Sequence, residues 1–419
     1  MIKILQVRNI DSFVESRRQK TSEKDRKLVQ SILNGVRKNG DSAVKKYEQK
    51  FNGRKTSQLR VSAKEIKEAW SKISSEEVTA LRDMSARLFA GPNQILANPW
   101  LEVGSVYRDL VPIPSVGCYI PGGQARYPSS VVMSVGPARK AGVKRIVVVS
   151  PPGRDGKIDP LTIVAANMCG ATEIYKVGGA QAIGALSYGT KSIPKVDKIV
   201  GPGGKFVSIA KSLVSDQTAI DMIAGPTELG IIADASSDPE LVALDLISQA
   251  EHSKDTMCFV ITQSKTIAKQ IQRSIKKLIP GTERSSIIKE SISKNGFIAV
   301  CKNQNEIVEL ANKIAPEHME LMVKNARSFS KKITGAGLLL IGKNTPSAAS
   351  DYLLGTNHIL PTNGFGRTRG GLGVLDFSKL QTIVESKKST LKEISDSLKA
   401  LTDAEDLPNH YKAVERRLD

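Results

Sequence analysis

RIVVVS at residues 145–150 is the stretch that decides the fold of this chain. It is an apolar, β-branched run closed by Pro151, Pro152 and Gly153, a pattern typical of a strand buried on both faces. Strand and helix patterns then alternate: a helix over 161–169, a strand over 173–177, a helix over 180–188, a strand over 196–200 and a helix from Lys205. Glycines stand at the turns from strand to helix. The alternation predicts a parallel sheet in an α/β domain.

The alternation continues on the C-terminal side of this stretch. The patterns predict a strand over 229–233, a helix over 238–251 with Pro239 at its first position, a strand over 257–262 and further pairs to about residue 342. Residues 343–372 are rich in Gly, Pro, Thr and Asn, which indicates a long functional loop region. The tail from about residue 378 has the pattern of two short polar helices.

On the N-terminal side, residues 24–51 predict two helices broken near Asn39 and Gly40, with Asp41 as the N-cap of the second. The predicted fold class is α/β. It has two Rossmann-like domains with parallel-rich sheets, plus small N-terminal and C-terminal helical segments.

Composition excludes several classes of protein. The chain of 419 residues is 40% hydrophobic, enough for a large core and for two domains or more. It has no apolar run long enough to span a membrane, and its start has no signal-peptide pattern. The four cysteines, at 118, 169, 258 and 301, form no CxxC pair and predict no disulfide framework. We therefore expect a reduced, cytoplasmic protein whose cysteines are core residues, with Cys118 beside Tyr119 as the one ambiguous case.

The net charge of +19 raises the alternative of a nucleic-acid-binding protein. Residues 1–70 hold 18 Lys and Arg against 8 Asp and Glu. These basic residues are interleaved at helical spacing with Leu28, Val29, Ile32, Leu33 and Val36, which favours a solvated helix face over a nucleic-acid arm. Aromatic residues are 5% of the chain, and no aromatic-basic RNA motif occurs.

All four histidines stand near polar or acidic residues. His252 follows Gln249 by three positions at the end of a predicted helix, which places both on one face. The others are His318 after Glu317, His358 seven residues after Asp351, and His410 five residues after Glu405. Taken alone, each of these histidines could equally be an ordinary surface or capping histidine with no role in a site. Gln249, His252, Asp351 and His410 are together a donor set of the kind that a catalytic zinc uses, although spacing alone does not show that they converge.

Three glycine turns are candidates for binding an anionic ligand. Gly178-Gly179 and Gly201-Pro202-Gly203-Gly204 each follow a strand and open a helix, where backbone N–H groups can meet a phosphate. Tyr119 precedes a third turn of this kind that ends at Gly123, and its ring could face a base or ribose. No turn matches GxGxxG, so tight turns needed only by the fold are an equally good explanation.

The adjacent residues Glu317 and His318 suit proton transfer, because the pKa of histidine lies near neutral pH. We expect this pair in a loop. A catalytic cysteine is not expected, because none lies beside a histidine or at a clear helix N-terminus.

Eight ordered segments carry a resemblance to a known family. They read YIPGGQARYPSSVVM (119–133), KVGGAQAIGALSYGT (176–190), VDKIVGPGG (196–204), DMIAGPTELGIIAD (221–234), DLISQAEHSKD (245–255), APEHMEL (315–321), SDYLLGTNHILPT (350–362) and AEDLPNHYKAVERR (404–417). Together they resemble the histidinol dehydrogenases, from about residue 25 to the end. A generic Rossmann protein would not supply the segments around His252, His318 and His358.

The resemblance implies an activity and a set of roles. The activity is oxidation of L-histidinol via histidinaldehyde to L-histidine with two NAD+, the last step of histidine biosynthesis. By resemblance, zinc is held by Gln249, His252, Asp351 and His410. Glu317 and His318 are the acid–base pair, and NAD contacts Tyr119, Gln181 and the turn at Gly204. Substrate meets these four zinc ligands together with Thr227, His318, His358 and Glu405.

The resemblance also implies a domain division and a homodimer. The expected parts are residues 1–22, an N-terminal segment; 23–118 with 227–375, a discontinuous domain with the metal and acid–base residues; 119–226, the NAD domain; and 376–419, a helical tail exchanged between subunits. By analogy Glu405 and His410 reach the partner subunit's site. We expect neither nucleic acid nor membrane as a partner.

Two departures from the family pattern stand out. Gly204 occupies a position where the family usually has Asn, so a side-chain hydrogen bond to NAD is missing. Thr227 replaces the usual Ser and keeps the hydroxyl. The alternatives are a family relative acting on another small alcohol, such as a sulfopropanediol, and a binding protein with a degraded site. Glu405 favours an amine-bearing substrate, and the complete zinc and acid–base set favours an enzyme.

Overall fold

The computed structural model describes residues 1–18, 21–53, 58–90, 106–122, 126–153 and 155–418. The chain forms two compact units, Met1–Gln94 with Ile113–Phe377, and Ile95–Pro112 with Ser378–Asp419. In the described part of the chain, no helix combines the length and apolar character needed to cross a membrane.

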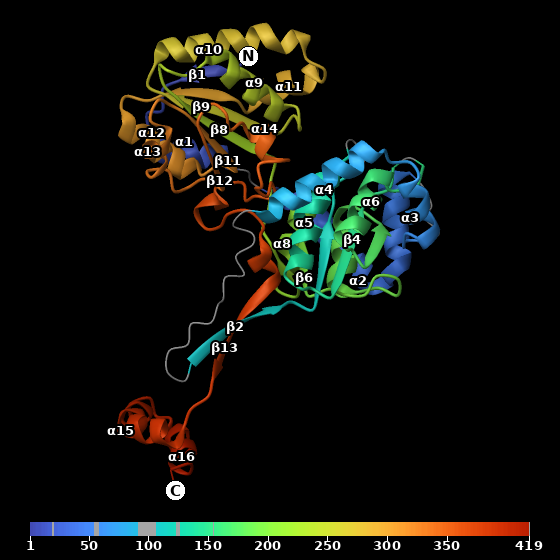
Figure 1. The fold of residues 1–419 in the computed structure, drawn as a ribbon, viewed down its shortest axis with the longest axis vertical. Helices are drawn as coiled ribbons and strands as arrows, with labels where there is room; N and C mark the ends of the chain where they lie inside the picture. Colours follow the sequence, from blue (N-terminus) through green and yellow to red (C-terminus); the bar gives the residue numbers. More distant parts are fainter. Residues whose placement is uncertain (19–20, 54–57, 91–105, 123–125, 154, 419) are drawn as a thin grey trace. The chain divides into compact units, whose positions relative to one another are not determined.

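The first unit contains a six-stranded parallel sheet (Figure 1). Its order is β1 (Lys3–Leu5), β10 (Phe297–Val300), β9 (Met257–Thr262), β8 (Glu228–Ala233), β11 (His318–Met322) and β12 (Leu338–Ile341). The chain runs from β8 outward through β9 to β10, then returns to the other side of β8 for β11. This reversal is the strand order of a Rossmann-like sheet.

Helices cover both faces of this sheet. Helices α9 (Pro239–Ala250), α10 (Lys265–Leu278) and α11 (Ser285–Lys294) share one apolar core with the sheet, which includes Ile231. Helices α1 (Ile10–Arg17), α12 (Gln304–Ile314) and α13 (Ala326–Ser330) share the other, which includes Ile232. Successive strand residues thus enter opposite cores, which explains why these strands are apolar throughout.

A second, five-stranded parallel sheet lies in the same unit. Its order is β5 (Glu173–Lys176), β4 (Arg145–Ser150), β3 (Ser115–Tyr119), β6 (Lys198–Val200) and β7 (Ala219–Ile220). The connecting helices are α5 (Pro128–Lys140), α6 (Pro160–Cys169), α7 (Gly179–Tyr188) and α8 (Lys205–Val214). The strand predicted at 145–150 is confirmed, and so is the two-sheet α/β class.

The N-terminal helices pack against this second sheet's helices. Helix α2 (Glu23–Asn52) contacts α7 and α8, α3 (Ala63–Trp70) contacts α6, and α4 (Ser75–Ala90) contacts α5. The predicted break in α2 is confirmed, because Gly40 has a φ of 51°. The predicted N-cap role of Asp41 is wrong: its carboxylate accepts hydrogen bonds from the N–H and the hydroxyl of Ser192 and so ties the kink to a distant loop. Packing does not show which parts fold alone, so the domain boundaries given above stay a prediction.

The second unit contains a two-stranded antiparallel sheet and two helices. Strand β2 (Val106–Pro112) pairs with β13 (Ser378–Val384), and α15 (Lys388–Ala404) and α16 (Pro408–Glu415) follow. The prediction of helix from about residue 378 is wrong for the first seven residues of the tail. They form a strand because they pair with β2, which lies some 270 residues earlier in the chain. No local sequence pattern reveals such a pairing. The two predicted helices follow this strand.

Candidate active site

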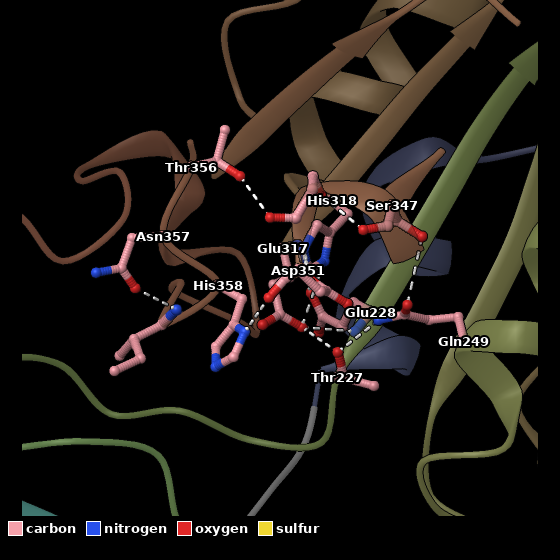
Figure 2. Close-up of polar contacts among 12 residues, drawn as sticks. Thr227, Glu228, Gln249, Glu317, His318, Ser347, Asp351, Thr356, Asn357 and His358 are labelled. Atoms are coloured by element: carbon pink, nitrogen blue, oxygen red, sulfur yellow. Dashed lines mark hydrogen bonds and ion pairs between the residues drawn. The ribbon is translucent and has the colours of Figure 1, made fainter. Parts of the chain in front are cut away.

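A cluster of polar side chains lies at the amino edge of the six-stranded sheet (Figure 2). Thr227 and Glu228 stand where β8 begins, and Glu317 and His318 where β11 begins. These strands are neighbours, with His318 opposite Leu229. The predicted acid–base pair is therefore buried at a strand start, and the expectation that it lies in a loop is wrong for His318.

Glu317 is fixed by two donors from β8. Its Oε2 accepts hydrogen bonds from the Thr227 hydroxyl at 2.5 Å and from the Glu228 N–H at 3.0 Å. Burial raises the pKa of Glu317, although the charge of His318 and these bonds act against the rise. A carboxyl group whose pKa moves toward neutral pH is suited to accept and release a proton there.

Glu228 faces Glu317 and was not predicted as a site residue. Its Oε2 accepts from the Glu317 N–H at 3.3 Å, and its Oε1 accepts from the Asn363 N–H at 3.0 Å. Burial raises the pKa of Glu228 to about 8. The available signal was a carboxylate at the start of an otherwise apolar strand, because buried charges are costly and usually have a purpose.

His318 lies between two carboxylates and is 2% exposed. Its Nε2 is 3.2 Å from Asp351 Oδ1, and its Nδ1 is 3.8 Å from Glu317 Oε2. Burial lowers the pKa of His318, but the Asp351 contact and the Glu317 charge outweigh it and raise the pKa to about 9.

Helix α9 supplies Gln249 to the same cluster. The buried Gln249 donates from Nε2 to Thr227 Oγ1 at 2.8 Å, and its Oε1 is 3.4 Å from the Ser347 hydroxyl. His252, two residues beyond the end of α9, is exposed, in contrast to Gln249. Partial loss of solvent lowers the pKa of His252, while the charge of Asp351 acts to raise it. His252 and Asp351 are therefore close enough to interact electrostatically.

Asp351 and His358 come from the loop region predicted to be functional. Asp351 follows the short helix α14 (Ser347–Ser350). His358 Nδ1 is 2.8 Å from the Asp351 carbonyl oxygen, and its Nε2 is 3.1 Å from Ser130 Oγ on α5. The loop thus links the six-stranded sheet to the helices of the five-stranded one.

The cluster fits a cation. Asp351 Oδ1 and both ring nitrogens of His318 are buried, and none makes a well-formed hydrogen bond within the described part of the chain. Carboxylate and imidazole groups are zinc donors. Still, no three His, Cys, Asp or Glu side chains among the described residues already stand in a metal-binding arrangement. Of the predicted ligands, Gln249, His252 and Asp351 come together here.

His410 and Glu405 belong to the second unit. His410 lies on α16, Glu405 is the first residue after α15, and both side chains are exposed. Their predicted roles in the site stay predictions.

The predicted NAD residues follow the carboxyl ends of β3, β5 and β6 in the five-stranded sheet, whose strand order reverses between β3 and β6. Crevices at such a reversal bind nucleotides in α/β folds. The Tyr119 hydroxyl accepts from the Gly179 N–H at 3.1 Å. Gln181 Nε2 donates to Glu48 of α2 at 2.7 Å, and Gln181 Oε1 is buried without a partner among the described residues. Gly123, the last residue of the Tyr119 turn, lies outside the described residues.

Gly204 is the N-cap of α8. A buried ion pair supports its turn: Lys211 Nζ donates to the Gly201 carbonyl at 2.9 Å and to Asp221, and Asp221 Oδ2 accepts from the Gly201 N–H at 2.8 Å. The ion pair therefore fixes the backbone turn that is predicted to bind phosphate.

The four cysteines are buried and free. Burial raises the pKa of the Cys118 thiol to about 12, which leaves it protonated at neutral pH. The prediction that the cysteines are core residues is confirmed, including the ambiguous Cys118.

A sequence model described as histidinol dehydrogenase matches residues 15–418. The chain belongs to the histidinol dehydrogenase family. It is 44% identical over 400 residues to the histidinol dehydrogenase of Methanococcus maripaludis, with 93% of each chain covered. It is 41% identical to that of Oceanobacillus iheyensis, covering 93% of this chain and 92% of the relative.

The fold agrees with membership of the histidinol dehydrogenase family. The crystal structure of histidinol dehydrogenase from Elizabethkingia anophelis superposes with a TM-score of 0.94 at 33% identity, covering 100% of this chain and 98% of the other. An acetylating aldehyde dehydrogenase from Geobacillus thermoglucosidasius, at 13% identity and a TM-score of 0.51, shares the fold alone.

Membership of the histidinol dehydrogenase family makes the chain an NAD-dependent oxidoreductase of histidine biosynthesis that acts on a small molecule. The family assignment made from the eight segments is confirmed. The relatives support the histidinol activity over the alternative of another small alcohol.

Proposed function

We propose that this enzyme oxidises L-histidinol via histidinaldehyde to L-histidine with two NAD+. The observation that carries the proposal is the buried pair Glu317 and His318 beside Asp351, in a chain 44% identical to a histidinol dehydrogenase. Two successive oxidations at one carbon need a base for the alcohol and a base for water. Two adjacent proton-accepting side chains meet that need.

His318 is the proposed base for the alcohol. It removes the hydroxyl proton as a hydride leaves the carbinol carbon, which gives the aldehyde. Its Nε2 faces Asp351 at 3.2 Å. A cation that engages Asp351 would release this nitrogen toward the substrate hydroxyl.

Glu317 is the proposed base for water. It takes a proton from a water molecule as the water oxygen bonds to the aldehyde carbon, and the protonated His318 gives its proton to the carbonyl oxygen, which yields the hydrate and restores His318 as a base. His318 then takes a hydroxyl proton of the hydrate as the second hydride leaves, which gives the carboxylate. The bonds from Thr227 and Glu228 fix the direction in which Glu317 faces.

Gln249, His252, Asp351 and the partner subunit's His410 would hold a zinc ion. When bound, zinc orients the substrate through its amino and imidazole groups. Asp351 Oδ1 is buried and makes no well-formed hydrogen bond among the described residues, which supports this assignment. NAD, when bound, accepts the hydrides. Tyr119, Gln181 and the backbone at Gly204 would hold it.

The remaining substrate residues follow from the same family. Thr227 and His358 lie in the cluster, and we propose that Glu405 reaches the partner subunit's site and meets the substrate ammonium as its counter-charge. We propose a homodimer that exchanges the second unit. In support, its apolar side chains Leu380, Val384 and Leu401 are more than half exposed in a single chain. A cytoplasmic location suits an NAD-linked biosynthetic enzyme with four free cysteines.

The test is the number of NADH formed per L-histidinol consumed, before and after metal chelation. We expect two NADH, loss of activity on chelation and recovery with zinc. A folded, zinc-loaded sample that leaves L-histidinol unchanged would refute the substrate assignment. Full activity after complete chelation would refute the proposed requirement for zinc.

Single-turnover kinetics distinguish the proposed role of His318 from that of Glu317. We expect His318→Asn to slow both hydride transfers heavily, by about 10²–10⁴-fold, because general-base catalysis contributes that much. Glu317→Gln should slow the oxidation of added histidinaldehyde more than that of histidinol. Equal losses in both half-reactions would argue against the water-activating role of Glu317.

A further inference from the structure

Two carboxyl groups that no role above uses meet behind the candidate active site. Glu320 lies on β11 two residues after His318, so both side chains project from the same face of the sheet. Asp245 lies on α9, one turn before Gln249. The two carboxyl groups are hydrogen-bonded to each other. Glu320 is 2% exposed.

One proton must lie between these two groups, because a carboxylate oxygen cannot donate. Glu320 Oε1 already accepts from the Ser347 N–H at 2.7 Å, and Glu320 Oε2 has no N–H or hydroxyl donor among the described residues. Burial raises the pKa of both groups, and the charge of Asp245 raises that of Glu320 further. Glu320 is the more deeply buried of the two, which favours the neutral form on Glu320, and it donates to the less buried Asp245.

The pair joins the three elements that carry the site residues. Glu320 fixes the first N–H of α14 to β11, and Asp245 fixes Glu320 to α9. The Ser347 carbonyl accepts from the Asp351 N–H at 2.9 Å, and the Ser347 hydroxyl is 3.4 Å from Gln249 Oε1. A displacement of Ser347 would thus move Asp351 and Gln249 relative to each other.

We propose that Asp245 and Glu320 are positioning residues, which share one proton and hold α14 against α9 so that Gln249 and Asp351 are placed for a common cation. The inference rests on the proposed function in one respect, the assignment of Gln249 and Asp351 to zinc. Groups behind the ligands of a metal commonly set its affinity by 10–100-fold.

The hydrogen-bond pattern makes a specific prediction for conservative changes. In Glu320→Gln, the amide can donate to Asp245 and its oxygen can accept from the Ser347 N–H, so both bonds survive. In Asp245→Asn, the amide oxygen can still accept the Glu320 proton. In Asp245→Ala, the buried proton of Glu320 has no acceptor, and an unpaired buried group is unfavourable. Glu240→Gln, on the exposed face of α9, is the matched control.

The experiment measures the zinc dissociation constant of the full-length protein by competition with a chromogenic chelator. The midpoint of thermal unfolding of each metal-free variant is measured alongside. We expect Asp245→Ala to bind zinc roughly 10–100-fold more weakly, and Asp245→Asn, Glu320→Gln and Glu240→Gln to bind within about threefold of wild type. The conservative variants separate positioning from general stability, because they retain the bonds.

Three outcomes would overturn the inference, and each has a different meaning. Unchanged zinc affinity in Asp245→Ala removes the positioning role. Glu320→Gln as weak as Asp245→Ala shows that the charge of the pair, and not its hydrogen bonds, sets affinity. A wild-type protein that does not bind zinc removes the metal assignment of the proposed function, and the positioning role with it.

Discussion

Gly204 is one of the two positions where the sequence is expected to depart from the family pattern, and its surroundings show that a side chain would have room there. It is the N-cap of α8 and carries no side chain to bond the first turn of the helix. A Cβ atom placed on Gly204 would meet nothing within 4 Å, whereas one on Gly203 would lie 2.3 Å from Val207. The space for a side chain exists at one position of the turn and not at the other.

We therefore expect Gly204→Asn to lower the KM for NAD several-fold and leave kcat unchanged. Asn is a favoured N-cap, so stability should rise by a few tenths of a kcal/mol. Steady-state kinetics against NAD and urea denaturation measure both effects. Gly203→Ala is the contrasting variant, and we expect it to weaken NAD binding because it displaces α8. An unchanged KM in Gly204→Asn would mean that backbone groups alone bind NAD at this turn.

Glu228 gives the fold a pH dependence of stability. Burial raises its folded pKa to about 8 from the ordinary value of 4.5. Between these values the folded state binds more protons than the unfolded state, so stability falls as pH rises, by at most about 1.4 kcal/mol per pH unit. Glu228→Gln should flatten this slope between pH 5 and 8 in denaturation experiments. Glu240→Gln, at an exposed position, is the control. If stability falls with pH as steeply in Glu228→Gln as in Glu240→Gln, the raised pKa of Glu228 is contradicted.

At the scale of elements, the sequence predicts what local periodicity controls and misses what distant pairing controls. The strand at 145–150 and the helix from Lys205 follow from their own apolar patterns and turn glycines. Strand β13 was missed because its partner β2 lies far away in the chain. The position of Glu228 opposite Glu317 depends on β8 and β11 being neighbours. Family resemblance, and not periodicity, brought Gln249 and Asp351 to attention as a pair.

Arg18 connects the N-terminal segment to the strand that begins with His318. Its guanidinium donates to the Ile314 and Lys313 carbonyls at 3.0 and 2.7 Å, and so caps the C-terminus of α12. Ala315 follows in a left-handed conformation, with a φ of 50°. The cap therefore fixes the turn that leads into Glu317.

We expect Arg18→Ala to lower the free energy of unfolding by roughly 1–3 kcal/mol, because two partly buried carbonyls lose a charged donor. Turnover should also fall, since Glu317 follows the turn that Arg18 holds. Denaturation and NADH formation measure the two effects. Arg8→Ala, an exposed arginine of the same segment, is the control. Stability equal to that of the control would show that Arg18 does not cap α12.

In the first unit, the two sheets have the same order of strands, and the predicted site residues lie at opposite edges of the two sheets. The predicted NAD residues lie at the carboxyl edge of the five-stranded sheet, and the acid–base pair lies at the amino edge of the six-stranded one. The bond from Ser130 on α5 to His358 joins the two regions. The residues predicted to bind NAD and the predicted acid–base pair therefore belong to different sheets, which explains why they come from separate stretches of the sequence.

At the scale of the whole molecule, the proposed homodimer predicts complementation between two defective subunits. His318→Asn removes a base of the subunit's own site, and His410→Asn removes a ligand that the subunit gives to its partner. In a mixed dimer, one site then carries both defects and the other carries none. Mixing the two inactive variants under conditions that exchange subunits should restore about a quarter of the wild-type activity, because half of the dimers are mixed. If His410 serves its own subunit, every site in the mixture carries one defect, and the activity stays at the level of the separate variants.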